Sequence, residues 1–278
     1  MTERPNFDRQ YIENELQKLA GSLVKKSAVF VGGGAAMAFY GLKEATKDVD
    51  VVVQTQDDVN SLALALRALG YSDPRRGVTV KYARMRATMI LENSEGFRWD
   101  IFERVVARKL SLSGNMVARS QLLFERGNLQ VRLLSKEDIF LLKSVTDRAR
   151  DLEDMGVVAE SGVDWSIIAA ECDCQSLHSK VVWEDALCSR LMDLRERRGI
   201  VSPIEKRICR LADQKFLEGW IVRRIREGIS TIKGLAKEAG EPEHLIRKVV
   251  EKLVRTNRLS VDQSTRPYRY MSHDESMD

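Results

Sequence analysis

Two hydrophobic patterns alternate along the first half of the chain. Apolar residues that recur every three or four positions indicate amphipathic helices, and short apolar runs between glycine or polar residues indicate buried strands. The helical pattern covers residues 8–25, 35–41 and 57–69. Strands are predicted at residues 28–31, 48–53, 79–85, 88–92, 97–102 and 129–134, with a hairpin turn at 93–96. This alternation predicts an α/β (α+β) fold built on a small mixed sheet.

From Ser135 onward the pattern becomes helical. Ser135 and Asp138 resemble a capping box, and helical periodicity continues to about residue 216. The end of the chain then predicts three helices and two strands, at residues 220–229, 232–239, 243–256, 259–261 and 268–270. That order is typical of a winged helix-turn-helix. We therefore expect a first domain over 1–158, a helical linker domain over 159–217 and a winged helix-turn-helix domain over 218–278.

The overall charge excludes binding of nucleic acid by bulk charge. The 278 residues hold 45 Lys and Arg against 41 Asp and Glu, a net charge of +4. Contact with nucleic acid would need a local basic patch. The N-terminus lacks the apolar core of a secretory signal, and the most apolar stretch, residues 27–42, is too short to span a membrane. We expect a cytoplasmic protein without membrane contact.

A run of glycines joins the first buried strand to the next helix. Gly32, Gly33 and Gly34 follow residues 28–31 directly. Free backbone N–H groups at the start of a helix suit a phosphate, and glycine lets a phosphate approach the backbone closely. The same turn could instead serve tight packing alone. We predict Gly33 and Gly34 as nucleotide-binding residues.

Two aspartates begin the following strand. Asp48 and Asp50 are two positions apart and therefore point to the same face, whereas the valines between and after them point into a core. Two carboxylates on one face raise each other's pKa unless a cation lies between them. Magnesium is the natural partner of carboxylate and triphosphate oxygens. The alternative is a solvated pair of acids at the start of a strand.

A third carboxylate is expected from the strand at 97–102. Asp100 lies between the bulky residues Trp99 and Ile101, where an acid without a partner is costly to bury. Three acids on neighbouring strands could hold two metal ions for an in-line phosphoryl transfer. Glu92 and Glu103 are weaker candidates for the third position. The sequence thus predicts a catalytic, metal-ligating set with two Mg²⁺ ions as cofactor: Asp48, Asp50 and Asp100.

These residues resemble a known family. Gly33-Gly34, thirteen further residues, Asp48-x-Asp50 and a later Asp100 resemble the DNA polymerase β-like nucleotidyltransferase superfamily. The fuller string Gly-Gly-x-Ala, Tyr-Gly and Thr-Lys-Asp-x-Asp is similar to its bacterial and archaeal branch, which includes the abortive-infection toxin nucleotidyltransferases. The resemblance covers residues 27 to about 158. It implies that the three acids bind metal and that the glycine pair holds a nucleoside triphosphate.

A second motif extends the resemblance. The stretch from Lys143 to Asp154 is similar to the Lys…Arg-x-Lys-Asp-x-x-Asp motif of those proteins, with Arg150 where many members carry Lys. We predict Lys143 as a nucleotide-binding residue, because it follows the apolar stripe of its helix toward the sheet. The alternative is a solvated helix surface, on which Lys143 pairs with Asp147 and Arg150 pairs with Asp154.

Basic residues gather at the end of the chain. Residues 219–271 hold 12 Lys and Arg against 6 Asp and Glu, which is a local charge of +6. The outer face of the predicted third helix and the wing carry the residues that we predict to bind nucleic acid: Arg247, Lys248, Lys252, Arg255 and Arg266. Acids on the same helix, Glu243 and Glu251, weaken this hypothesis. The alternative is a winged helix that contacts protein or dimerises.

The leading hypothesis is a magnesium-dependent nucleotidyltransferase with a winged helix that binds DNA or RNA. It would move a nucleoside monophosphate from a nucleoside triphosphate onto a hydroxyl of an RNA, a protein or a small molecule. The alternatives are a non-catalytic, nucleotide-sensing DNA-binding regulator and a component of a toxin–antitoxin pair. The sequence leaves the nucleotide, the acceptor and a possible oligomer open.

Overall fold

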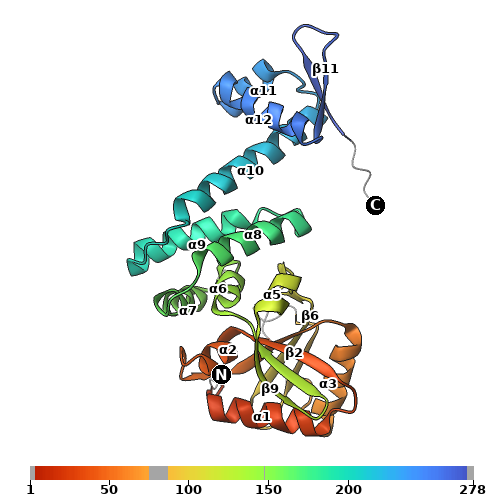
Figure 1. The fold of residues 1–278 in the computed structure, drawn as a ribbon, viewed down its shortest axis with the longest axis vertical. Helices are drawn as coiled ribbons and strands as arrows, with labels where there is room; N and C mark the ends of the chain where they lie inside the picture. Colours follow the sequence, from red (N-terminus) through yellow and green to blue (C-terminus); the bar gives the residue numbers. More distant parts are fainter. Residues whose placement is uncertain (1–3, 75–86, 147, 274–278) are drawn as a thin grey trace. The chain divides into compact units, whose positions relative to one another are not determined.

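A mixed β-sheet forms the core of the N-terminal part of the chain (Figure 1). The computed structural model describes residues 4–74, 87–146 and 148–273. It divides into two units, Met1–Glu205 and Lys206–Asp278, and each is described by itself below. The three domains that the sequence suggests stay a prediction.

The main sheet has six strands in the order β5-β6-β4-β2-β10-β9. The pairs β4–β6 and β2–β10 are parallel and the other neighbours are antiparallel, which confirms the predicted mixed α/β (α+β) fold. The prediction missed strand β9, and its strand at 79–85 lies outside the described residues. The strand bounds are β2 (Ser27–Gly32), β4 (Asp48–Val53), β5 (Met89–Glu92), β6 (Arg98–Glu103), β9 (Gln121–Arg126) and β10 (Leu129–Leu133).

Helices and short two-stranded sheets surround this sheet. Helices α1 (Arg9–Ser22) and α3 (Gln56–Ala68) pack against each other and against the sheet (Figure 1). Their apolar positions, such as Leu16 and Leu66, are fully buried, as the periodicity predicts. The remaining short elements are β1 (Phe7–Asp8), α2 (Gly33–Phe39), β3 (Ala45–Thr46), β7 (Val105–Val106), β8 (Leu110–Ser111) and α5 (Gly114–Arg119).

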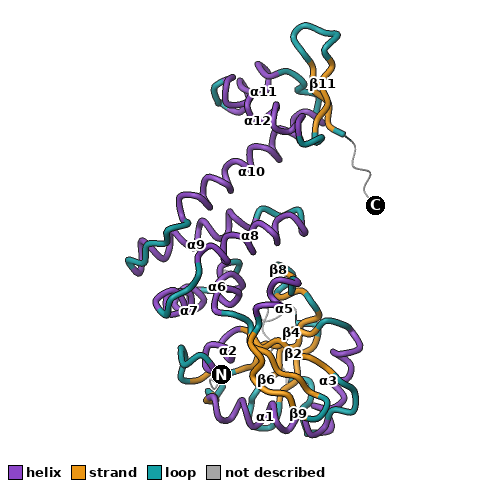
Figure 2. Tube along the Cα trace, in the orientation of Figure 1, coloured by secondary structure: helices purple, strands orange, loops and turns teal. Residues whose placement is uncertain are grey.

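Four helices follow the sheet in the same unit (Figure 2). The Ser135 hydroxyl accepts the Asp138 N–H at 3.2 Å, so the predicted cap is confirmed. Helix α6 packs against α2, α7 and α8. The bounds are α6 (Lys136–Ser144), α7 (Ala149–Glu160), α8 (Trp165–Ser179) and α9 (Trp183–Arg198).

A buried ion cluster ties these helices to the end of the sheet region. Arg119, the last residue of α5, bonds both oxygens of Asp138 on α6 and, at 2.6 Å, the carboxylate of Glu171 on α8. Asp138 is completely buried and Glu171 is 2% exposed. Burial raises the pKa of Asp138, although the Arg119 contacts oppose that rise. The one guanidinium therefore neutralises two carboxylates that water barely reaches.

The C-terminal unit contains three helices followed by a hairpin. Helix α10 (Glu205–Arg226) begins well before the predicted residue 220, because Gly219 does not interrupt it. The other elements lie close to the predicted positions, and β11 pairs antiparallel with β12. Isoleucine, leucine and valine side chains from all three helices form one core. The bounds are α11 (Ile232–Ala239), α12 (Glu243–Arg255), β11 (Leu259–Asp262) and β12 (Arg269–Ser272).

None of the helices in the described ranges is both long enough and apolar enough to cross a membrane.

Candidate active site

Three aspartates meet on neighbouring strands of the main sheet. Asp48 and Asp50 share one face of β4, and the register of the parallel pair β4–β6 places Asp100 directly beside Asp50. All three line one cavity of about 110 Å³. The structure therefore brings together the three acids that the sequence singles out. Glu92, a weaker candidate, instead pairs with Arg98.

Burial and mutual repulsion alter the acidity of this trio. Burial, followed by repulsion from Asp48, raises the pKa of Asp50 to about 7. Asp100 is 2% exposed, and burial together with the charges of Asp50 and Asp48 raises its pKa well above the usual value. The third acid, Asp48, pairs with Arg4 at 3.2 Å. A bound cation would favour the charged form of these carboxylates.

One oxygen of this trio fits a metal ion especially well. The Oδ1 atom of Asp100 is buried and has no hydrogen-bond partner among the described residues. A buried carboxylate oxygen without a partner is costly, and oxygen is the ligand type that Mg²⁺ prefers. Within the part of the chain that the structure describes, no three acid, His or Cys side chains already form a complete metal-binding group. Asp48, which Arg4 holds, would have to turn toward a bound ion.

The glycines beside the trio are required by close packing. Gly33 has a φ of +57°, and a Cβ there would lie 1.9 Å from Oδ2 of Asp50. A Cβ on Gly34 would lie 2.6 Å from the Thr46 hydroxyl. These two positions therefore make room for the acid-bearing strand. Gly34 lines the cavity of the three acids, and Gly33 lines an adjoining cavity of about 50 Å³. Their predicted contact with a nucleotide stays a prediction.

Cations and further acids also line the cavity of the three aspartates. The buried Lys143 ammonium donates to Asp154 at 2.6 Å and to Asp151 at 3.2 Å. Lys43 donates to both oxygens of Asp154, at 2.7 and 2.9 Å. Burial would raise the pKa of Asp154, but the two ammonium groups outweigh it and hold the pKa below its usual value. Asp154 thus belongs to a buried network, and the alternative of a solvated helix surface is wrong for it.

Arg148 links this network to the three aspartates. Its guanidinium donates to Asp151 at 2.6 and 3.0 Å, and its charge opposes the rise that burial causes in the pKa of Asp50. Lys143 and Arg148 line both cavities. The predicted partner of Lys143, Asp147, lies outside the described residues.

Sequence reasoning missed several cations that line this cavity, and it missed Arg4, which pairs with one of the cavity's acids. Lys47 precedes Asp48 directly, and its position in the chain could have drawn attention to it. Lys43 and Arg148 could be suspected only as charges near the two motifs. Arg4 lies 44 residues before Asp48, and no pattern connects the two.

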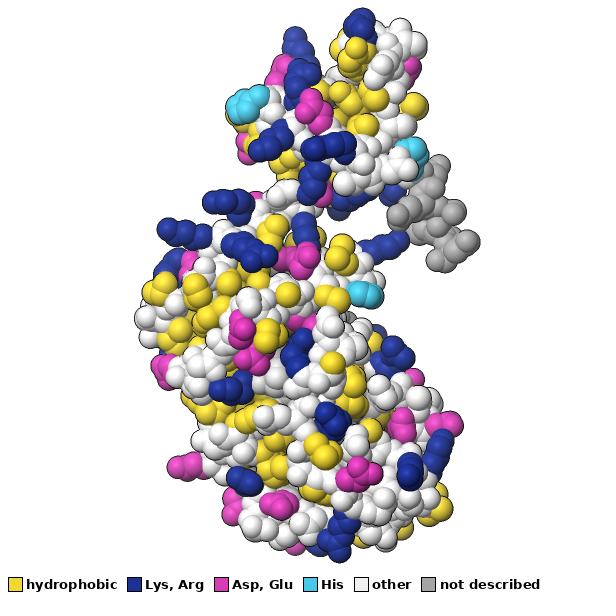
Figure 3. Space-filling view, viewed as in Figure 1, with side chains coloured by type: hydrophobic (Ala, Val, Ile, Leu, Met, Phe, Trp, Pro, Cys, Tyr) yellow, Lys and Arg dark blue, Asp and Glu magenta, His cyan; other side chains and the backbone are white. Residues whose placement is uncertain are grey.

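The five basic residues predicted at the C-terminus separate into two groups. Lys248, Lys252 and Arg255 line a groove between α10 and α12, and Lys252 donates to Glu218 at 2.5 Å. Burial raises the pKa of Tyr270 on the hairpin, and the charge of Arg247 lies close enough to oppose that rise. On the hairpin, the Arg266 guanidinium stacks 4.0 Å from the Tyr268 ring. Figure 3 shows basic, acidic and hydrophobic side chains interspersed over this unit.

The acidity of Asp50 leads to a pH-dependent stability. The folded protein holds the Asp50 proton up to about pH 7, whereas an unfolded Asp releases it near 3.8. Between these values the folded state binds more protons, so the free energy of unfolding should fall as pH rises, by at most about 1.4 kcal/mol per pH unit. Asp50→Asn should lack this contribution. Urea unfolding in EDTA, from about pH 5 to pH 8, compares the two; identical slopes would contradict the assignment.

Comparison with known proteins agrees with this geometry. A family model described as a nucleotidyltransferase of unknown function (DUF6036) matches residues 10–202. The match spans more than half of the chain and includes every acid of the cavity. No protein in a search of curated proteins matches the chain.

Proposed function

Because the chain belongs to this family of nucleotidyltransferases of unknown function, we propose that it transfers a nucleoside monophosphate from a nucleoside triphosphate to a hydroxyl acceptor with the help of magnesium. The observation that carries the proposal is the pairing of Asp50 with Asp100 across β4 and β6, with a buried Asp100 oxygen that lacks a partner. In the reaction the acceptor oxygen bonds to the α-phosphorus, the bond to the β-phosphate breaks, and pyrophosphate leaves.

The residues that line the two cavities take different roles in the proposed reaction. Asp48, Asp50 and Asp100 would hold two Mg²⁺ ions, which would neutralise charge on the triphosphate and the leaving pyrophosphate. With the metal ions bound, Asp100 would be ionised and would accept the proton of the acceptor hydroxyl. The backbone amides of Gly33 and Gly34 contact the triphosphate, and Gly34 lines the cavity. Lys143 and Arg148, which line both cavities, hold phosphate oxygens while they remain paired with acids of α7.

The superfamily branch, the location in the cell and the class of acceptor belong to the same proposal. The motif resemblance supports the bacterial and archaeal branch of the DNA polymerase β-like superfamily, in which toxins occur. We place the protein in the cytoplasm and expect the acceptor to be an RNA, a protein or a small molecule. The acceptor decides between a toxin-like role and a metabolic one.

Nucleotide binding should depend on magnesium. A ligand that binds only the folded state raises its melting temperature. We expect a nucleoside triphosphate with Mg²⁺ to raise it, and the same nucleotide in EDTA to leave it unchanged, because the metal ions would supply the positive charge that joins the phosphates to the aspartates. Asp100→Asn should lose the shift, whereas Asp57→Asn, a change at an exposed carboxylate of α3, should keep it. No shift with any of the four nucleotides would argue against the site. A shift without any transfer would instead support the nucleotide-sensing regulator.

The C-terminal unit is proposed to bind nucleic acid as a winged helix. Its three helices and hairpin support this role, and Arg247 and Arg266 are both exposed on the side of the hairpin. Lys248, Lys252 and Arg255 are assigned to the groove instead, so the proposed surface is smaller than the sequence suggests.

Removing these two arginines should weaken binding to duplex DNA in a salt-dependent way. Each phosphate contact contributes about 0.9 to the slope of log affinity against log salt, so Arg247→Ala with Arg266→Ala should reduce the slope by nearly two. A control that also removes two exposed charges, Lys26→Ala with Lys206→Ala, should change it little. Fluorescence anisotropy over a salt series measures both. Equal slopes would remove these arginines from the interface.

A further inference from the structure

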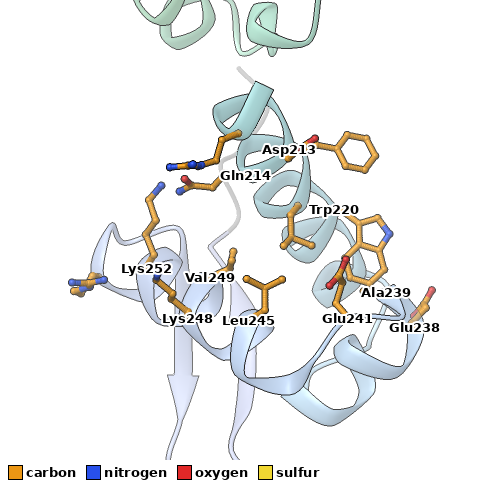
Figure 4. Close-up of a pocket in the computed structure, with 14 residues that line it drawn as sticks. Asp213, Gln214, Trp220, Glu238, Ala239, Glu241, Leu245, Lys248, Val249 and Lys252 are labelled. Atoms are coloured by element: carbon orange, nitrogen blue, oxygen red, sulfur yellow. The ribbon is translucent and has the colours of Figure 1, made fainter. Parts of the chain in front are cut away.

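A groove of about 760 Å³ runs along the C-terminal unit between α10, α11 and α12 (Figure 4). Its floor is apolar and consists of Leu217, Trp220, Leu245 and Val249. Phe216 also lines it and is 73% exposed, which is unusual for so large an apolar side chain. An exposed apolar surface framed by polar residues is typical of a binding site for another macromolecule.

The two ends of the groove carry opposite charges. Figure 4 shows Lys248 and Lys252 at one end, and Glu238 and Glu241 at the other, with Leu245 and Val249 between the lysines and the glutamates. Lys252 is paired with Glu218, and Glu238 is paired with Arg224 at 3.0 Å. Lys248 and Glu241 are both exposed. The charge therefore changes sign along the length of the groove.

We propose that this groove is the surface through which two copies of the chain pair about a two-fold axis. In such a pair the same patch faces itself, so each residue of one copy meets the partner residue at the opposite end. A groove that is basic at one end and acidic at the other then complements itself. Lys248 of one copy meets Glu241 of the other, twice in each dimer, and the exposed Phe216 rings cover the apolar floors.

Nucleic acid fits the groove less well than a second copy does. Glu238 and Glu241 would repel phosphates at one end, and one cation of the other end, Lys252, is already paired with Glu218. The apolar floor offers phosphate no contact. An aromatic and aliphatic floor with a charged rim is instead the composition of a protein–protein interface. This inference does not depend on the proposed transferase activity.

Charge reversal on the full-length chain tests the proposal. Sedimentation equilibrium of the unaltered chain should show a dimer that dissociates on dilution. Lys248→Glu places two glutamates against each other at both contacts, and Glu241→Lys does the same with lysines. Each variant alone should raise the dimer dissociation constant about tenfold or more. An equal mixture of the two variants should recover pairing, because each new glutamate then faces a new lysine.

A second pair of variants tests the apolar part of the interface. Phe216→Asp should also weaken the dimer, whereas Leu64→Asp, at a side chain of similar exposure (71%) on α3, should not. Lys237→Glu, an exposed charge reversal outside the groove, is the control for charge. A chain that stays monomeric, a dimer indifferent to the groove variants, or a mixture that fails to recover pairing would each overturn the proposal.

Discussion

Asp50→Asn should abolish nucleotidyl transfer while leaving the protein folded. Asp50 lies beside Asp100 and shares the face of Asp48, so it is the central member of the trio. Metal ions contribute several kcal/mol to the stabilisation of a phosphoryl-transfer transition state, and each 1.4 kcal/mol is a factor of ten in rate, so we expect a loss of about a thousandfold or more. An amide cannot supply the negative charge that holds a divalent cation.

Asp50→Asn should not destabilise the protein, although it removes the activity. Since burial and Asp48 already disfavour the charged form of Asp50, a neutral amide of the same shape should leave the melting temperature in EDTA unchanged or raise it. Asp57→Asn provides the matched control and should retain full activity. Appreciable transfer by Asp50→Asn would remove Asp50 from the assigned role, and a lowered melting temperature in EDTA would contradict the predicted stability.

Arg119→Met should be among the most destabilising single changes in the N-terminal unit. It would leave Asp138 and Glu171 buried without their shared cation. Breaking a buried ion pair by removing one partner costs about 3–5 kcal/mol, because the remaining charge stays uncompensated. Urea unfolding monitored by circular dichroism measures the change in the free energy of unfolding.

A surface pair gives the contrast for this prediction. Arg67 binds Asp73 at 3.1 Å, but both side chains are well exposed. Arg67→Met should therefore cost less than about 1 kcal/mol. If the triple variant Arg119→Met, Asp138→Asn, Glu171→Gln regains part of the loss, uncompensated charge is the cause. Equal effects of Arg119→Met and Arg67→Met would contradict the account.

The parts of the fold that follow from local pattern could be predicted from the sequence. The alternation of aspartate and valine over residues 48–53 identified both the strand and the face of its two acids. Asp100 was identifiable as an acid within an apolar strand, and its position beside Asp50 needed only that the two strands pair. The sequence predicted that Gly33 lets a phosphate approach the backbone. The structure adds that Asp50 leaves no room there for a side chain.

The parts that depend on tertiary packing could not be predicted. Lys43 and Lys143 meet at Asp154 although Lys43 lies 111 residues from that acid. The helix pattern gave Arg150 as the partner of Asp154, because pattern reasoning considers only neighbours on one helix. In the same way, the sequence pattern placed the basic residues of α12 on one face of the helix. In the structure, Lys248 and Lys252 line a groove between α10 and α12, whereas Arg247 lies beside the hairpin.

The position of a transferred label tests the central proposal most directly. The protein is incubated with magnesium, a mixture of RNA, protein and small-molecule acceptors, and each nucleoside triphosphate labelled at either the α- or the γ-phosphate. Nucleotidyl transfer predicts that the α-label becomes attached to an acceptor while the γ-label is released in pyrophosphate, and that Asp50→Asn does neither. Attachment of the γ-label would identify a kinase, and attachment of neither label with any nucleotide would contradict the proposed transferase.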